Sequence, residues 1–112
     1  MITNYFYEVF KNNQDKNALI FNEKEYAYQD LIKNIQHWKS EIENNKIRKG
    51  DVVALFGDFS FNTISILFAL IDNDNIIVPL DYSNKNKSEN KLDIALVNTI
   101  ISINKFDDVE FS

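Results

Sequence analysis

Residues 68–84 read FALIDNDNIIVPLDYSN, and they join an apolar helical run to a short β-branched run that closes on Pro79, the only proline of the chain. An Asp/Asn string at residues 72–75 separates the two runs. A strand that starts close beneath its helix needs a residue with positive φ at the joint, and Asn and Asp accept that conformation best after glycine. A proline is tolerated at a strand end, where its missing N–H costs little. The stretch therefore predicts a buried helix that leads directly into a buried strand.

The chain after residue 50 predicts alternating strands and helices. Three short apolar runs without alternation are typical of strands covered on both faces; they are VVALFG at 52–57, IIVPL at 76–80 and TIISI at 99–103. Residues 61–73 predict a helix capped by Ser60, and their nearly continuous apolar character predicts deep burial. Residues 91–97 predict one or two helical turns after a polar loop at 82–90. This order predicts an α/β fold whose βαβαβ unit has a mostly parallel three-stranded sheet with right-handed crossovers.

The first half of the chain predicts a hairpin and a long helix. Residues 17–22 and 24–28 are typical of two short paired strands. Residues 28–44 predict a helix because one apolar stripe recurs at helical spacing; the stripe consists of Leu31, Ile35, Trp38 and Ile42. Asn44 and Asn45 suit the left-handed turn that ends helices.

The two ends of the chain give weaker patterns. Residues 3–12 predict a helix that is capped by Thr3, and its apolar face would consist of Tyr5, Phe6, Val9 and Phe10. The last eight residues, KFDDVEFS at 105–112, show no clear pattern.

Composition narrows the class of protein. The 112 residues, 45% of them hydrophobic, suit one domain or part of one. A net charge of -5 without a Lys/Arg stripe argues against nucleic-acid and membrane-surface partners. The absence of cysteine excludes disulfides, zinc–thiolate sites and a Cys nucleophile. The N-terminus lacks the pattern of a signal peptide, and the longest apolar stretch, 64–71, is too short to span a bilayer. We therefore expect a cytoplasmic protein.

Three stretches occur in an order and spacing that resemble the N-terminal end of the adenylate-forming enzymes: acyl-CoA synthetases, luciferases and adenylation domains of nonribosomal peptide synthetases. YAYQDLIKNI at 26–35 is similar to the family's Thr-Tyr-x-Glu-Leu stretch. IRKGDVVALFGDFSF at 47–61 resembles its Gly-Val-x-x-Gly-Asp-x-Val-Ala-Leu turn and strand. FALIDNDNIIVPLD at 68–81 resembles its Leu-Lys-Ala-Gly-Ala-x-x-Val-Pro-Leu-Asp stretch. The resemblance spans roughly residues 4 to 103.

The resemblance implies that residues 1–112 form a single partial domain, the N-terminal portion of an adenylate-forming large domain. It implies a parent enzyme that uses ATP and Mg²⁺ to adenylate a carboxylic or amino acid. The acyl group would pass to a thiol of CoA or of carrier-protein phosphopantetheine. The partners of this chain would be the remainder of the parent chain, and those of the parent its acid substrate and the thiol carrier.

The family's phosphate-binding loop, its nucleotide motifs and its catalytic lysine lie beyond the resemblance. A phosphate-cradling loop needs several glycines close together, whereas Gly50 and Gly57 stand apart. No catalytic, cofactor-binding or metal-binding residue is therefore assigned to this chain, and the chain alone is expected to be inactive.

The sequence departs from the family at four positions. Ala27 stands where the family's capping box has Thr, so only the acid Asp30 remains of that box. Lys46 and Asp74 replace glycines, and Phe59 replaces an Asn before the helix cap. These changes indicate a divergent member with the same fold.

Several polar residues are candidates for a site. His37, the only histidine, follows the apolar stripe beside Trp38 without an indicated partner for general-base chemistry, so a structural or surface role is expected. Asp72 and Asp74 precede a predicted strand and Asp81 follows it. A strand of five or six residues separates its ends by roughly 17–20 Å, so one shared Mg²⁺ site is not expected. Asp81 either lines a site at the strand's carboxyl end or caps the next loop.

Other groups have ordinary explanations. The aromatic residues at 5, 6, 10 and 38 form either core or an aromatic ligand box, and core is the usual outcome at helical spacing. Lys85, Lys87 and Lys91 indicate a solvated loop.

Two further functions stay open. The chain is alternatively a stand-alone α/β binding or interaction module, such as a split subunit or scaffold. The other, a phosphoacceptor receiver domain, would need an acidic pair after the first strand and an acceptor Asp after the middle one, and Asp58 and Asp81 alone do not make that set. A sheet that stops after its third strand leaves an edge and an apolar face uncovered, which predicts self-association or marginal stability.

Overall fold

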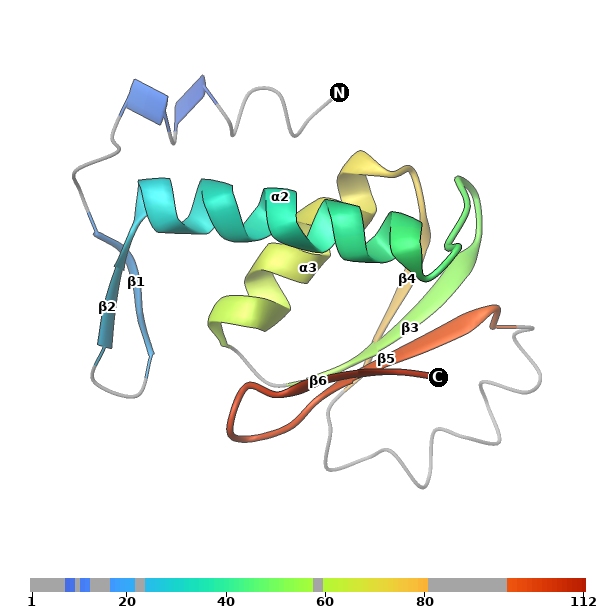
Figure 1. Cartoon of the computed structure of the whole chain (residues 1–112). Coiled ribbons are helices and arrows are strands. Elements are labelled where there is room, and N and C mark those ends of the chain that lie inside the picture. Colours follow the sequence, from blue (N-terminus) through green and yellow to red (C-terminus); the bar gives the residue numbers. More distant parts are fainter. Residues whose placement is uncertain (1–7, 10, 13–16, 22–23, 58–59, 81–96) are drawn as a thin grey trace.

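The structure of the chain, a computed structural model, describes residues 8–9, 11–12, 17–21, 24–57, 60–80 and 97–112 (Figure 1). Its named helices and strands are β1 (Asn17–Phe21), β2 (Lys24–Ala27), α2 (Tyr28–Asn44), β3 (Val52–Phe56), α3 (Phe61–Asp72), β4 (Ile76–Leu80), β5 (Thr99–Ile103) and β6 (Val109–Phe111). β1 and β2 pair antiparallel, so the predicted hairpin and long helix are both confirmed.

Three predicted segments fall largely or wholly outside the described residues. Residues 8–9 and 11–12 are helical, in agreement with the helix expected at 3–12, whose other residues are not described. The polar loop expected at 82–90 and residues 91–96 of the second crossover helix also lie outside the described part of the chain.

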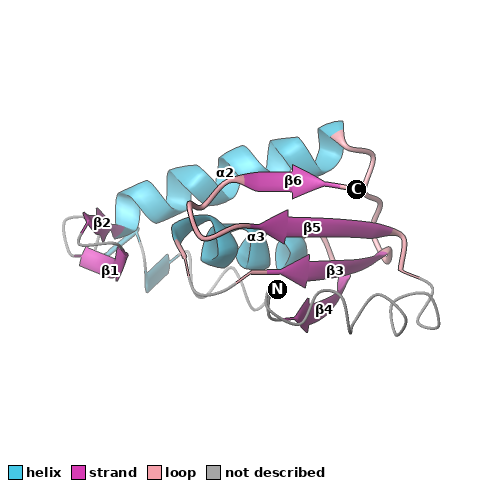
Figure 2. Cartoon of the chain, turned by 90° about the horizontal axis from the view of Figure 1, so that it is seen from below, coloured by secondary structure: helices cyan, strands magenta, loops and turns pink. Residues whose placement is uncertain are grey.

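One sheet has the strand order β4-β3-β5-β6 (Figure 2). β3 pairs parallel with β4 and with β5, with Val52 opposite Ile76 and Val53 opposite Thr99. The Val52 N–H donates to Asn98 Oδ1 over 2.7 Å, and the Asn98 N–H donates back to the Val52 carbonyl over 2.9 Å. These paired bonds fix the start of β5 against the start of β3. The predicted parallel arrangement is confirmed.

The predicted strand number is wrong, because β6 adds a fourth strand antiparallel to β5. β6 comes from the C-terminal residues in which no pattern was found. A three-residue strand is too short to show alternation clearly, and only Val109 and Phe111, on either side of Glu110, hint at it.

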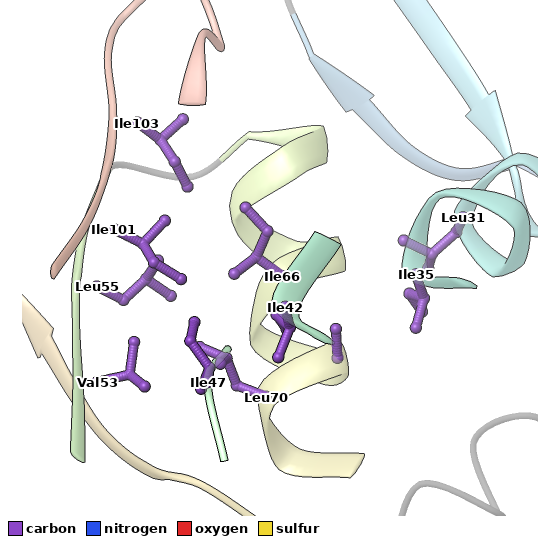
Figure 3. Packing of buried hydrophobic residues seen from close by; sticks show 11 residues of the cluster. Leu31, Ile35, Ile42, Ile47, Val53, Leu55, Ile66, Leu70, Ile101 and Ile103 are labelled. Carbon is purple, nitrogen blue, oxygen red and sulfur yellow. The ribbon is translucent and has the colours of Figure 1, made fainter. Parts of the chain in front are cut away.

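Helices α2 and α3 lie on the same face of the sheet (Figure 1). Alternate strand residues point toward α3, where Ile66 and Leu70 are fully buried (Figure 3); these strand residues are Val53, Leu55, Ile101 and Ile103. The helix α2 adds Leu31, Ile35 and Ile42, with Trp38 partly buried beside them. The predicted stripe of α2 is therefore its core face. The opposite face of the sheet buries Ala54 and Phe56 in a second, smaller cluster.

Burial predictions for α3 and β4 need correction. α3 buries only one side, because Ile64, Leu67 and Ile71 stay partly exposed although the helix is apolar nearly all round. β4 is an edge strand of the described sheet, with Ile76 57% exposed, and it is only partly covered: Ile77 and Val78 pack against the clusters on opposite faces but stay half-buried. The apolar run of β4 is typical of a central strand, so composition alone did not reveal its place at the edge.

Two turns use left-handed residues. Asp74 has φ 57°, which confirms the prediction for the joint between α3 and β4. At the end of α2 the prediction is wrong by one or two residues: Asn45 has φ -87°, and Lys46 takes the left-handed conformation with φ 61°. Gly50 follows with φ 86°, and its N–H donates to the Asp74 carbonyl over 3.1 Å. The two turns therefore lie against each other.

Helix starts follow the predicted capping. The Ser60 side chain accepts from the Thr63 N–H at the start of α3. At α2 the Ala27 N–H donates to Asp30 Oδ2 over 3.1 Å. The acid half of the family's capping box therefore works here without the hydroxyl half.

Candidate functional site

The carboxyl ends of β3 and β5 meet the start of α3, and this edge is the first place to look for a ligand. From β3 the chain passes to β4 on one side, and β5 pairs with the other side of β3. Open α/β sheets bind ligands outside the carboxyl ends of their strands, where the strand order reverses in this way. A helix N-terminus at that edge also favours anions.

The chain's own side chains fill the start of α3. The Thr63 N–H donates to Ser60 Oγ over 3.0 Å, and the Asn62 N–H donates to Asp107 Oδ2 over 3.3 Å. The Asp107 carboxylate, from the turn between β5 and β6, thus takes the place that an anion would take. Gly57 leaves no spare room, because a Cβ there would lie 3.0 Å from Thr63 Oγ1. The described residues of this edge therefore form a packed joint.

A cluster of polar side chains extends this joint toward α2. Asn62 Oδ1 accepts from Trp38 Nε1 over 3.0 Å and from Asn34 Nδ2 over 2.9 Å. Asn34 Nδ2 also donates to Ser65 Oγ, and Asn62 Nδ2 donates to the Asp107 carbonyl over 2.9 Å. We call these five residues the Asn62 cluster. It connects α2, α3 and the β5–β6 turn through one amide side chain.

Asp107 carries the unusual features of this cluster. Its φ is 67°, and its Oδ1 atom is buried without a hydrogen-bond partner. A three-residue hairpin loop commonly ends in a left-handed residue, usually glycine, and the Asp107 N–H donates to the Asn104 carbonyl over 3.0 Å as such a turn requires. Asp is used here because its carboxylate also caps α3. Sequence reading missed the Asn62 cluster, because its members are scattered along the chain from Asn34 to Asp107.

Two grooves lie on the helical side of the described structure. The larger, of about 1000 Å³, runs between the carboxyl ends of α2 and α3, where Lys39 forms an ion pair with Asp72. The smaller, of about 380 Å³, has Tyr26 stacked on Phe61 over 3.9 Å, with His37 at its rim. Both are open surface hollows with charges of both signs, and neither brings together a nucleophile, a base and an oxyanion donor.

The predicted candidates do not form a site in the described residues. His37 is exposed and touches Trp38 edge-on, in agreement with a surface role. Asp72 pairs with Lys39, and Asp74 pairs with Lys49 over 3.3 Å. Trp38 packs with the core as expected, but its aromatic partners at 5, 6 and 10 are not described, and neither is Asp81.

The part of the chain that the structure describes offers neither a metal site nor a membrane span. There, no three His, Cys, Asp or Glu side chains lie close enough to hold a metal ion. None of the helices described is long and apolar enough to cross a membrane.

Comparisons with known proteins bear on the fold. No protein-family model and no curated protein matches the sequence. Among solved structures, the Klebsiella oxytoca NpsA N-terminal subdomain matches 87% of the chain with 26% identity and a TM-score of 0.79. NpsA-ThdA, an artificially fused adenylation–PCP di-domain from the same organism, matches 91% with 24% identity and a TM-score of 0.80. The nonribosomal peptide synthetase FmoA3 matches 89% with 13% identity and a TM-score of 0.78.

The chain spans only part of these structures: 26% of the NpsA subdomain, 20% of the NpsA-ThdA fusion and 11% of FmoA3. The matched structures come from nonribosomal peptide synthetases, one of the three groups of adenylate-forming enzymes that the sequence motifs resemble. The described residues supply packed helices and sheet without a set of catalytic groups. The chain therefore has the fold of part of the N-terminal subdomain of a nonribosomal peptide synthetase adenylation domain.

Proposed function

We propose that this chain is the scaffold portion of an ATP-dependent ligase that adenylates a carboxylic or amino acid and passes it to a thiol. One observation carries the proposal: the match to the NpsA N-terminal subdomain over 87% of the chain at 26% identity. NpsA has been solved in complex with 3-hydroxyanthranilyl-AMSN, and a fusion joins it to a PCP domain. The artificial fusion to a PCP domain favours a carrier-protein thiol over CoA as the acceptor.

In this proposal the chain has a structural role and does not bind the nucleotide. Asp107 and Ser60 already satisfy two N–H groups at the start of α3, so this helix does not offer its N-terminus to a phosphate. With Gly50 and Gly57 apart, the chain cannot build a glycine-rich phosphate loop. ATP, Mg²⁺ and the acid would therefore bind to residues that follow this portion in the parent protein.

The first test is to read the source gene beyond the codon for Ser112. We expect an open frame that encodes a Ser/Thr/Gly-rich loop with Pro-Lys-Gly. The full product should catalyse carboxylate-dependent exchange of pyrophosphate into ATP, whereas residues 1–112 alone should bind no ATP in calorimetry.

A stop codon directly after Ser112, or a full product that neither binds ATP nor exchanges pyrophosphate, would overturn the ligase proposal. ATP binding by residues 1–112 alone would also contradict it, because the scaffold role assigns the nucleotide to other residues. In either case, a stand-alone binding or interaction module becomes the better explanation.

A further inference from the structure

The free edge of β4 differs from an ordinary sheet edge. β4 is the outer strand of the described sheet, and Ile76 and Pro79 are exposed on it. An edge strand presents unpaired N–H and C=O groups, which accept strands from other molecules unless something blocks them. The question is which backbone groups of β4 point outward.

The hydrogen bond at the start of β4 shows which of its backbone N–H and C=O groups point toward β3. The Ile76 N–H donates to the Asp51 carbonyl over 3.0 Å, so the Ile76 backbone faces β3. Direction alternates along a strand in a parallel ladder. Val78 therefore also faces β3, whereas Ile77 and Pro79 face away from the sheet. The pairing of Val52 with Ile76 through Leu55 with Pro79 is unbroken, so no bulge interrupts this alternation.

Pro79 thus removes an N–H from the open side of β4 and none from the ladder with β3. Within β4 the outward-facing donor that remains is Ile77. A strand that paired with β4 would place a backbone carbonyl opposite Pro79 without a donor, and the proline ring would project toward it. We infer that Pro79 closes the β4 edge to strand pairing, so that a strand added to the described sheet would pair at its other edge, β6.

This inference does not depend on the ligase proposal, and it bears on the self-association expected from the sequence. Strand pairing at an uncovered edge is a ready form of self-association, and β4 and β6 are the two edges of the described sheet. The inference excludes this pairing at β4. Association through apolar side chains, such as those of Ile64 and Leu67 on α3, stays possible.

The test uses residues 1–112 and the Pro79→Ala variant, which restores the N–H while adding no apolar surface. In the unsubstituted chain, amide exchange measured by NMR should be slow at Ile76 and Val78 and fast at Ile77. Sedimentation should show that Pro79→Ala self-associates at least tenfold more tightly than the unsubstituted chain. The Ile77 amide of the variant should then become protected as concentration rises.

Lys105→Val is the matched control, because it adds an apolar side chain at an exposed turn without adding an edge N–H. It should associate no more tightly by strand pairing, and Ile77 should stay unprotected in it. The inference is overturned if the Ile77 amide of the unsubstituted chain becomes protected as the protein concentration rises. It is also overturned if Pro79→Ala associates no more tightly than the unsubstituted chain. If Pro79→Ala fails to fold, amide exchange at Ile77 in the unsubstituted chain is by itself enough to test the inference.

Discussion

At the scale of single residues, three non-glycine residues in the described part of the chain have positive φ: Lys46, Asp74 and Asp107. Each stands at a turn for which glycine is the usual choice. Asp107 has a compensating contact, because its carboxylate accepts the Asn62 N–H. Asp74 is of a type that tolerates this conformation. Lys46 has neither advantage.

Asp107→Ala should lower the free energy of unfolding by about 2–3 kcal/mol, because it loses a helix cap and keeps a side chain in a left-handed position. Asp107→Gly should cost less, about 1 kcal/mol, because glycine adopts this φ without strain. Urea unfolding of residues 1–112 measures both. If glycine costs as much as alanine, backbone strain at this position is not significant.

Lys46→Gly should raise the free energy of unfolding by about 0.5–1 kcal/mol, since the strain of φ 61° disappears. Asp74→Gly should give a smaller gain. The control is Lys49→Gly, an exposed neighbour without positive φ, which should destabilise the chain. A loss of stability in Lys46→Gly as large as in the control would contradict this ranking.

At the scale of helices and strands, Asn62 connects three elements. Its side chain binds Trp38 and Asn34 on α2 and the Asp107 carbonyl in the β5–β6 turn. Replacing it removes the partner of Trp38 Nε1 and of the Asp107 carbonyl, whereas Asn34 keeps its bond to Ser65. Each such loss costs about 1–3 kcal/mol. Helix pairing in this chain therefore depends on a polar contact as well as on the apolar stripe.

We expect Asn62→Ala to lower the free energy of unfolding by about 2–4 kcal/mol. Trp38→Phe should cost less, because it removes only one donor from Asn62. A double-mutant cycle between them should show a coupling of at least about 0.5 kcal/mol. Strict additivity of the two losses in thermal unfolding would mean that the Trp38–Asn62 bond carries no stability of its own.

At the scale of the whole molecule, much of the fold was predictable because local signals agreed. Helix α2, strands β3 and β5 and the Ser60 cap follow from periodicity, apolar runs and one hydroxyl. The edge position of β4 and the short strand β6 were not predictable, because they depend on which strands meet in space. The Asn62 cluster was not predictable for the same reason, because hydrogen bonds between residues far apart in the sequence produce no periodic pattern.

The partial burial of α3 leads to a prediction for the whole chain. Residues 1–112 should unfold with a free energy of about 5 kcal/mol or less, at the low end for native domains. In the longer ligase that we propose, the amides of α3 should exchange more slowly than in residues 1–112, because further residues would cover Ile64, Leu67 and Ile71. Equal exchange rates in the two proteins would show that α3 gains no cover.

The strand order β4-β3-β5 has a consequence for synthesis on the ribosome. β3, α3 and β4 are contiguous in sequence and can form a unit early, but β5 ends at Ile103, after a further stretch of chain. At 5–20 residues per second, that stretch takes about 1–5 s to emerge. Throughout that interval the edge of β3 (Val52–Phe56) that later pairs with β5 has no partner strand. The nascent chain is then most open to chaperones and to mispairing, at a strand that is central in the finished protein.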